Sequence, residues 1–597
     1  NLVTDNDKRN RSFFSFWGEA ELVKNLKYKI NVAYDKTNFK HFHYEPKYDL
    51  GFYYLNTQYN MQQRNGIQNY ATVENTLTYQ LQKGKHKVDF LAGTSYINKT
   101  YEDIYGTAKG TQDLGQFINF SYITNPADKA VFSYNDVANL LSYFGRINYN
   151  YNDRYMVTGN IRRDGSSKFG PAYRFGNFSS IAAAWNVANE SFIHLPKAIS
   201  SLKLRAGYGV LGNENGLPPY PYVAYLNTSA SYDFNGVLAP GSTAVTQADP
   251  NLHWETTTTF NAAVDLGLFN NSLLFTAEYF NRKSTDLQAN IPIPLSVGSV
   301  PSTITTNAAS TRNTGLEFSA TYAKSSGAFK YNINANVSTL TNKVLKLGGT
   351  NNPIFGSGSK TEVGRSIGEL YGFITEGIFQ NAADVSGHAT QTNAAPGDVK
   401  FKDVDGLGSN GKPTGKPDGT ITDDDRVYLG KTIPSLYYGL NASASYKDFD
   451  VSVFFQGSGG NKVFNGVYQA LLAGQYGNSS VDELNYWTPT NTKTNIPRPI
   501  IGDPNQNGRF SDRFVQNGSY LKLQNAQVGY TLPEGVFGRM HAIKSLRVYI
   551  SGQNLFILSG YKGYDPDFIS DGLFSRGFDY GSFPNPRTIM FGLQLGL

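Results

Sequence analysis

The sequence has 597 residues and combines many aromatic residues (41 Tyr, 39 Phe and 4 Trp) with 60 Gly, no Cys and a mean hydropathy of −0.39. Only 17% of the residues are charged, which argues against disorder, because disordered chains combine low hydrophobicity with high net charge. The absence of Cys excludes disulfide scaffolds, thiol nucleophiles and Cys-ligated metal centres. No segment approaches ~18 consecutive apolar residues, which excludes membrane-spanning helices. The net charge is +6 and the basic residues are scattered, so nucleic-acid binding is not expected.

Apolar and polar residues alternate along the chain in segments of about ten residues, as in strands with one apolar and one polar face. In segment 145–163 this alternation is interrupted only by Asn152 and Asp153, which predicts a hairpin with a short polar turn. The same pattern flanks further short turns at 270–271, 325–327 and 447–448. The chain is therefore predicted to be built from antiparallel hairpins.

Long stretches rich in Gly, Asn, Ser, Thr and Pro separate these hairpins. They cover 211–253, 284–311, 341–433, 457–518 and 554–585. Connections longer than about 12–15 residues are uncommon in compact soluble domains. Short turns alternating with long loops are typical of transmembrane β-barrels, whose short turns are periplasmic and whose long loops are extracellular. We therefore expect the short turns in the periplasm and loops 211–253 and 457–518 outside the cell.

The alternatives are a soluble sandwich, a propeller or a β-solenoid. No repeat with a fixed period is visible, which disfavours the propeller and the solenoid. The polar faces hold Asn, Thr, Ser, Lys and Arg, which suit a wet lumen better than a dry sandwich core. In the last segment every second residue is apolar (Ile589, Phe591, Leu593, Leu595 and Leu597), whereas Gly592, Gln594 and Gly596 face the other way. The predicted fold class is thus all-β, a transmembrane antiparallel β-barrel.

Several segments resemble the SusC-type (RagA-like) TonB-dependent transporters of Bacteroidota. They are Arg163-Asp164-Gly165-Ser166-Ser167-Lys168-Phe169-Gly170, Leu202-Lys203-Leu204-Arg205-Ala206-Gly207-Tyr208-Gly209, Asn251-Leu252-His253-Trp254-Glu255-Thr256-Thr257, Arg312-Asn313-Thr314-Gly315-Leu316-Glu317, Gly552-Gln553-Asn554-Leu555 and Pro584-Asn585-Pro586-Arg587-Thr588. Each segment alone is a weak signal. Their order over nearly the whole chain makes the resemblance specific.

The resemblance implies a barrel of about 22 strands with a plugged lumen. The alternation predicts only about 17 strands, beginning near Arg11. The sequence also lacks counterparts of the signal peptide, the N-terminal extension, the TonB box and the plug. We therefore expect residues 1–597 to be the C-terminal portion of the barrel, or one part of a split protein, with the plug and the first strands absent.

An acidic segment in the longest irregular stretch is a candidate calcium site. When the interrupting residues 407–417 are removed, Asp403, Asp405, Asp418, Gly419, the Thr420 carbonyl, Thr422 and Asp425 fall on the positions of an EF-hand-like loop. The resemblance supports this hypothesis, because many relatives carry an uninterrupted acidic motif here. The departures are the insertion and Asp instead of Glu at the last position. The alternative is a solvated acidic loop without a metal.

Other candidate sites are weaker. His41-x-His43 is the only His spacing that suits a metal, and a surface pair explains it better. Segment 165–169 fails the Gly-x-Ser-x-Gly motif because it ends in Phe, and phosphate-binding glycine loops are missing, so we expect no enzyme and no required cofactor. Most aromatics should be girdle or core residues. Those in a long loop are candidates for stacking on sugars or on a partner: Tyr220, Tyr222, Tyr225, Tyr232 and Phe234.

The resemblance implies TonB-dependent import of oligosaccharides or peptides across the outer membrane, with a SusD-like surface lipoprotein as a lid. TonB would act through a segment that this sequence lacks. The alternatives are a siderophore or cobalamin receptor without a lid, and a structural or adhesive outer-membrane protein without transport. The sequence does not identify the substrate.

Overall fold

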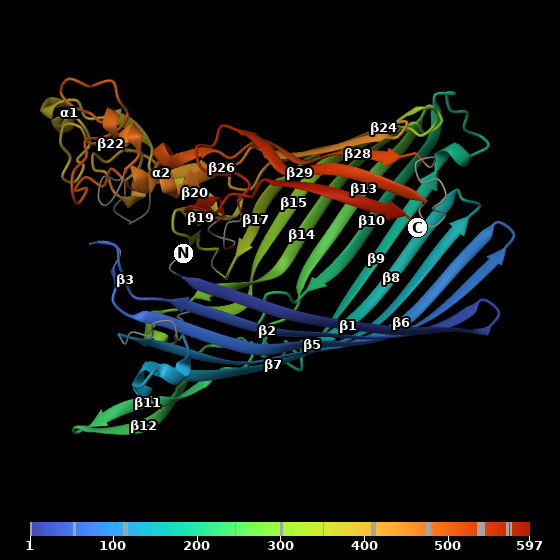
Figure 1. Cartoon of the computed structure of the whole chain (residues 1–597), viewed down its shortest axis with the longest axis horizontal. Coiled ribbons are helices and arrows are strands. Elements are labelled where there is room, and N and C mark those ends of the chain that lie inside the picture. Colours follow the sequence, from blue (N-terminus) through green and yellow to red (C-terminus); the bar gives the residue numbers. More distant parts are fainter. Residues whose placement is uncertain are drawn as a thin grey trace. The chain divides into compact units, whose positions relative to one another are not determined.

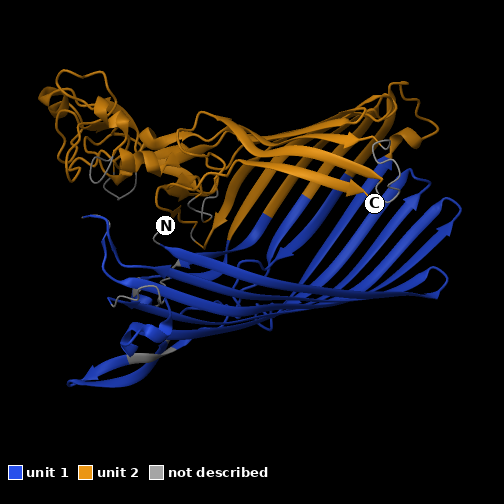
Figure 2. Ribbon diagram, in the orientation of Figure 1, with its two compact units in different colours: residues 1–185, 206–259, 284–308 blue, residues 186–205, 260–283, 309–597 orange. Residues whose placement is uncertain are grey.

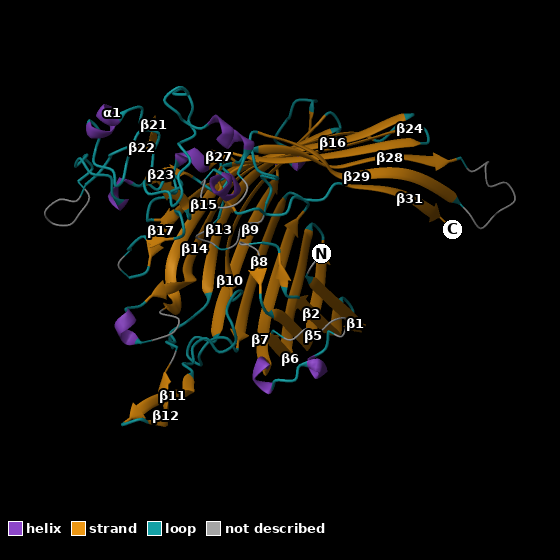
Figure 3. Cartoon of the chain, turned by 60° about the vertical axis from the view of Figure 1, so that its left-hand side comes forward, coloured by secondary structure: helices purple, strands orange, loops and turns teal. Residues whose placement is uncertain are grey.

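The chain folds almost entirely into strands. The computed structural model describes residues 3–51, 55–111, 118–244, 246–298, 303–349, 351–406, 414–472, 479–533, 544–568, 572 and 576–596. The two α-helices described, α1 (Ala382–Ser386) and α2 (Gly466–Leu471), are short (Figure 3). None of the described helices is long and apolar enough to cross a membrane. The chain divides into unit 1, residues 1–185, 206–259 and 284–308, and unit 2, residues 186–205, 260–283 and 309–597 (Figure 2).

Eighteen strands belong to one sheet. Five of them have residues in both units: β9 (Phe175–Asn186), of which only Asn186 lies in unit 2, β10 (Ile199–Asn213), β13 (Glu255–Leu268), β14 (Leu273–Pro292) and β15 (Thr303–Lys324). β16 (Phe329–Thr339) and β17 (Thr341–Leu347) pair with successive parts of β15 and form one strand interrupted at Leu340. The sheet therefore agrees with the predicted count of about 17 strands. The first strand begins at Thr4, earlier than the predicted Arg11, because its first residues are all polar and show no alternation.

In unit 1 seven strands form an antiparallel ladder, drawn from blue to teal in Figure 1. In order they are β1 (Thr4–Val23), β2 (Leu26–Glu45), β5 (Tyr59–Lys83), β6 (His86–Gly110), β7 (Lys129–Tyr151), β8 (Tyr155–Ser166) and β9 (Phe175–Asn186). Their tight turns use left-handed backbone at Asn25, Gly84, Asn152 and Asp153, a conformation that Asn, Asp and Gly tolerate best. The hairpin predicted at 152–153 is confirmed.

Unit 2 contains a second antiparallel ladder. After β15 and β16 it continues through β24 (Leu436–Tyr446), β25 (Phe449–Gly459), β28 (Tyr520–Leu532), β29 (Ser545–Ser559) and β31 (Thr588–Gly596). Positive φ angles at Asn270, Asn271, Gly327 and Lys447 place the other three short turns where they were predicted.

Each ladder has an exposed apolar face and an opposite polar face. In unit 2 the apolar face carries Ile333, Leu440, Val451, Val528, Ile550, Phe591 and Leu593. Phe591 is 82% exposed and Leu593 is 75% exposed. On the opposite face Asn334 donates a hydrogen bond to Thr321, and Arg547 pairs with Asp450. Apolar side chains outside and polar ones inside are the pattern of a transmembrane barrel, so the predicted C-terminal alternation is confirmed for the described residues. Leu597 lies outside them.

Some stretches predicted as irregular contain strands. β14 and β15 extend through most of 284–311, and β11 (Leu226–Phe234) pairs with β12 (Val237–Ala244) inside 211–253. A barrel strand needs only ~9–11 residues to cross the bilayer. The longer strands continue beyond it, where lipid no longer requires apolar residues at every second position. Minor elements in the first half of the chain are β3 (Tyr48–Asp49) and β4 (Leu55–Asn56).

Most of stretches 341–433 and 457–518 belongs to a folded body next to the ladder of unit 2. We call this body the loop body and define it as the described residues of 351–435, 460–519 and 560–587. Its strands are β18 (Ile354–Phe355), β19 (Ser359–Thr361), β20 (Glu369–Gly372), β21 (Thr375–Ile378), β22 (Val399–Phe401), β23 (Val427–Gly430), β26 (Lys462–Asn465), β27 (Val515–Asn517) and β30 (Phe578–Asp579). Its core clusters bury Leu370, Phe464, Phe514 and Phe578, and separately Phe373, Val399 and Phe401. The expected irregular loops therefore have a core of their own.

Candidate functional site

The polar face of unit 1 carries a cluster of aromatic and charged side chains, which we call the aromatic cluster: Phe39, Arg64, Tyr101, Asp103, Tyr105, Phe132 and Tyr134. Cross-strand pairing brings it together, because Tyr101, Asp103 and Tyr105 alternate along β6 and pair with β5 and β7. Arg64 Nε donates to Asp103 Oδ2 over 2.7 Å, and the hydroxyl of Tyr101 donates to the same oxygen over 2.6 Å. The Asp103 side chain is fully buried, so this ion pair fixes the position of Arg64.

Rings surround this ion pair. The Tyr101 centroid lies 5.9 Å from the centroids of both Phe39 and Tyr134, and Tyr105 lies 5.0 Å from Phe132. The guanidinium of Arg64 lies 5.5 Å from the Tyr105 centroid, within the range of a cation–π contact. Phe132 is 47% exposed and Tyr134 is 48% exposed. The cluster therefore offers open ring surface beside a fixed cation.

The two histidines singled out by their spacing lie on the same face. His41 and His43 point to the same side of β2, as predicted, and face Asp5 of β1 with Nδ1 to carboxylate distances of 3.6 and 3.2 Å. These contacts account for the pair without a metal ion.

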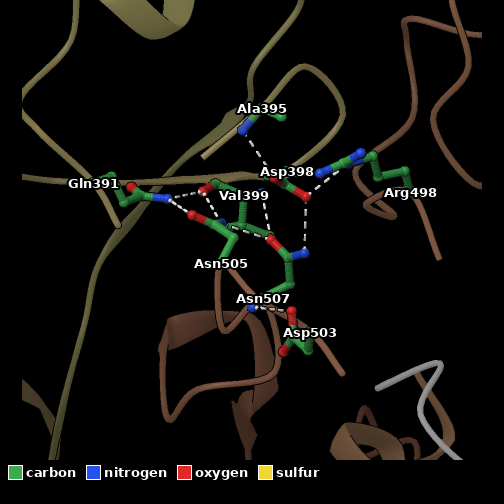
Figure 4. A network of polar contacts seen from close by, with 8 residues as sticks. All are labelled: Gln391, Ala395, Asp398, Val399, Arg498, Asp503, Asn505 and Asn507. Carbon is green, nitrogen blue, oxygen red and sulfur yellow. Dashed lines mark hydrogen bonds and ion pairs between the residues drawn. The ribbon is translucent and has the colours of Figure 1, made fainter. Parts of the chain in front are cut away.

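The loop body is held by a buried polar network (Figure 4). The two oxygens of Asp398 accept from Arg498 Nε at 2.9 Å and Nη2 at 3.0 Å. Asn507 donates to Asp398 over 3.1 Å, and its carbonyl oxygen accepts from the amide N–H of Val399 over 2.7 Å. The hydrogen bond to Asp398 raises the pKa of the Arg498 guanidinium above its usual value. Buried polar groups that are all satisfied make a rigid body, so the network fixes the surface that surrounds it.

The same network joins segments far apart in the sequence. Gln391 Nε2 donates to the carbonyl of Val399 over 2.7 Å and to Asn505 Oδ1 over 2.6 Å. Asp503, in left-handed backbone, accepts from the amide N–H of Asn507 over 2.7 Å. Two of the long stretches between the predicted hairpins, 341–433 and 457–518, are thereby joined into one body.

The structure brings the acidic candidates together through backbone N–H groups. Asp403 Oδ2 accepts from Gly419 over 2.7 Å, and Asp418 Oδ1 accepts from Thr420 over 2.9 Å. Asp405 accepts from the amides of Gly415 and Gly406 over 2.6 and 2.8 Å. Burial acts to raise the pKa of the Asp405 carboxyl, but these backbone hydrogen bonds together have the larger, opposite effect. The pKa of Asp405 is therefore below its usual value.

The last two candidates close the segment. Asp425 is buried, and its carboxylate accepts from the amides of Val404 and Thr422 over 2.8 and 2.7 Å, while Thr422 Oγ1 accepts from the amide of Asp424 over 3.2 Å. In the part of the chain that the structure describes, no group of three or more His, Cys, Asp or Glu side chains is arranged to hold a metal ion. Calcium binding at these residues stays a prediction.

The segments that carry the family resemblance have packing roles. In unit 1 Phe169 and Trp254, from two of these segments, are buried with ring centroids 5.0 Å apart. In unit 2 Asn554 has left-handed backbone, and its side chain donates to the carbonyl of Pro586 over 2.9 Å. These contacts tie loop ends to strands.

The aromatics of loop 211–253 lie on and before the β11–β12 hairpin. The Tyr232 and Phe234 centroids are 4.9 Å apart, and those of Tyr220 and Tyr222 are 6.3 Å apart. Tyr225 is also exposed. No observation tests their role in ligand binding, which stays a prediction.

Sequence reasoning missed Arg64, Asp103, Asp398 and Arg498. Arg64 and Asp103 occupy polar positions of long strands, where charged residues are ordinary, and their pairing depends on strand register. Asp398 and Arg498 lie in a stretch without periodicity. A signal that was available is the turn-rich segment around Asn505 and Asn507, whose amides suit buried backbone contacts.

Comparisons with known proteins agree with this architecture. A family model described as "TonB dependent receptor-like, beta-barrel" matches residues 2–555. TonB-dependent receptor P3 of Formosa agariphila is 31% identical over 609 residues, which cover 97% of this chain and 57% of that protein. TonB-dependent receptor SusC of Bacteroides thetaiotaomicron is 30% identical over 462 residues, which cover 76% of this chain and 43% of that protein.

The fold also matches a solved structure. The RagAB peptide transporter superposes with a TM-score of 0.83 at 22% identity, covering 100% of this chain and 62% of that chain. The chain thus spans less than two thirds of the length of each of these relatives.

Proposed function

We propose that this chain, which belongs to the TonB-dependent receptor-like β-barrel family of the outer membrane, is the barrel part of an importer of glycans or peptides. The known relatives of the SusC type support the transport class. Import would be driven by TonB through a part of the receptor outside this chain.

The observation that carries this proposal is the aromatic cluster. Tyr101 lies about 15 residues into β6, roughly 50 Å along the strand from its tight turn at ~3.4 Å per residue. The apolar band of an outer-membrane barrel is about 25 Å tall, so a cluster this far from a periplasmic turn belongs near the extracellular mouth. Open rings beside a fixed Arg suit the first contact with an entering sugar or peptide.

The proposed partner is a SusD-like surface lipoprotein that closes over the receptor and holds cargo above the lumen. The loop body supports this part of the proposal, because its buried network makes it a rigid surface where a lid could rest. A siderophore or cobalamin receptor would need no lid. A purely adhesive outer-membrane protein would need neither a lid nor an open ring surface facing the polar side.

Uptake measured in cells that carry the complete receptor tests the proposal. Phe132→Ala combined with Tyr134→Ala should lower the uptake of fluorescent oligosaccharides or peptides at least tenfold at subsaturating concentration. Val131→Ala is the matched control, because Val131 is adjacent in sequence, exposed and on the opposite face. Unchanged uptake in the double variant would exclude the cluster as a cargo surface.

Deleting the gene of a neighbouring surface lipoprotein should abolish the same uptake. If ferric siderophore or cobalamin enters normally in that strain through this receptor, the receptor without a lid is favoured. If no labelled cargo enters even with the lipoprotein present, the adhesive alternative is favoured.

A further inference from the structure

The loop body contains a cavity of about 230 Å³. Its apolar wall contains the buried residues Leu472, Ile496 and Phe514, and its polar lining includes Thr375, Asn495, Asp512 and Arg513. Because liquid water occupies ~30 Å³ per molecule and pockets for drug-sized ligands measure ~300–1,000 Å³, the cavity has room for one small group of a larger molecule.

Arg513 is the unusual member of this lining. It donates to the backbone carbonyls of Asn507 and Asn495 over 3.1 and 3.4 Å. Within the described residues, no carboxylate lies within ion-pair distance of its guanidinium. Two other arginines of the loop body do pair with a buried carboxylate: Arg498 with Asp398, and Arg365 with Glu369.

Asp512, the residue before Arg513 in the sequence, also lines the cavity. Asp512 Oδ1 accepts both the amide N–H and the hydroxyl of Thr375, over 3.1 and 2.8 Å. Burial lowers the pKa of the Arg513 guanidinium below its usual value, although the nearby charges of Asp512 and Asp503 act to raise it. Arg513 is partly buried, and an anion that reaches its guanidinium through the cavity would stabilise its charge further.

Arg509 is the comparison. Burial lowers the pKa of its guanidinium as well, but this guanidinium lies 4.9 and 4.5 Å from the ring centroids of Phe373 and Phe401 and does not line the cavity. Arg513 lies 5.2 Å from one ring only and faces open volume.

We propose that the Arg513 cavity binds the C-terminal carboxylate of a peptide, with the last side chain against the apolar wall. A guanidinium matches a carboxylate through two parallel hydrogen bonds. The wall of Leu472 and Ile496 suits an aliphatic side chain. This inference rests on the proposed function, because it treats the peptide as cargo.

Calorimetric titration of the complete receptor in detergent tests the inference. The probes are acetyl-Ala-Ala-Leu with a free carboxylate and the same peptide as its amide. The free acid should bind at least tenfold more tightly than the amide. Arg513→Gln should remove this preference, and Arg513→Lys should keep part of it, because the charge remains while the planar fork is lost.

Arg426→Gln is the matched control, because it removes a cation of the same loop body that pairs with exposed Asp423 and lies outside the cavity lining. It should keep the full preference. Equal affinities of acid and amide in the parent, or a preference that survives Arg513→Gln, would overturn the inference. Glucuronate should bind more weakly than the free acid of acetyl-Ala-Ala-Leu. Tighter binding of glucuronate, measured by its displacement of that peptide, would overturn the peptide assignment in favour of an acidic sugar.

The titration measures binding without transport. A receptor that imports peptides yet shows no acid preference would therefore contradict only this inference. A receptor that shows the preference but imports no cargo would contradict only the proposed function.

Discussion

The ladder of unit 2 and the loop body belong to the same unit but place their apolar residues in opposite ways. In the ladder Val451, Val528 and Phe591 face outwards and are exposed. In the loop body Leu370, Phe464 and Phe514 face inwards and are almost fully buried. The difference is one of solvent, because the strands face lipid whereas the loops face water and must build a core.

The two regions also differ in how they satisfy polar groups. Strand backbones pair with neighbouring strands, so the ladder needs few buried side-chain contacts. The loop body lacks long ladders and uses side chains such as Asp398, Asn505 and Asn507 to satisfy backbone and charge. Damage to the ladder should thus depend on which face is changed, and damage to the loop body on which network residue is removed.

The largest expected effect is in the loop body. Asp398→Ala leaves Arg498 and Asn507 without their partner in a site where Asp398 is 0% exposed, and breaking a buried ion pair costs about 3–5 kcal/mol. Hydrogen exchange of the Val399 and Phe401 amides should therefore speed up strongly. Asp423→Ala, at an exposed ion pair worth about 0–1 kcal/mol, is the control, and similar exchange in both variants would contradict this account.

The next effect is in the last strand. Leu593→Arg puts a charge on the lipid face, which costs about 2–4 kcal/mol near the bilayer midplane. Gln594→Arg lies opposite Arg547 on the polar face, where a like-charge pair costs about 0.2–1 kcal/mol. The free energy of unfolding from lipid vesicles should separate the two variants. Equal losses would show that the assignment of the faces is wrong.

A smaller effect is expected in the acidic segment. Calcium binding predicts that millimolar calcium protects segment 403–425 from proteolysis, and that Asp405→Ala combined with Asp418→Ala removes the protection. A solvated loop predicts the same cleavage with calcium and with a chelator, because water and salt screen the repulsion between exposed carboxylates. The cleavage rates of the parent protein with calcium and with a chelator decide between the calcium site and the solvated loop.

The last test concerns membrane topology, and its substitutions should leave the stability of the protein unchanged. Cysteine introduced by Ser231→Cys in the β11–β12 hairpin should react with an impermeant maleimide on intact cells. Ser326→Cys, in the short turn between β15 and β16, should react only after the outer membrane is permeabilised. The chain has no other cysteine, so each signal is unambiguous. The reverse labelling would invert the proposed orientation.

The sequence by itself determined the strands and their faces. Alternation with period two around 147–161 and 589–595 predicted hairpins and an apolar outer face, because each strand residue points to one side or the other regardless of its distant neighbours. Turn residues such as Asn152 and Asn270 marked the short connections for an equally local reason, their tolerance of left-handed backbone.

Only the tertiary structure decided what the long stretches do and which charges meet. The pair Arg64 and Asp103 depends on the register between β5 and β6, and the network around Asp398 joins residues about a hundred positions apart. Segments without periodicity carry no local signal for such contacts, because their burial is set by packing between distant parts of the chain. The cavity at Arg513 follows from the same packing, since its walls come from segments separated by more than a hundred residues.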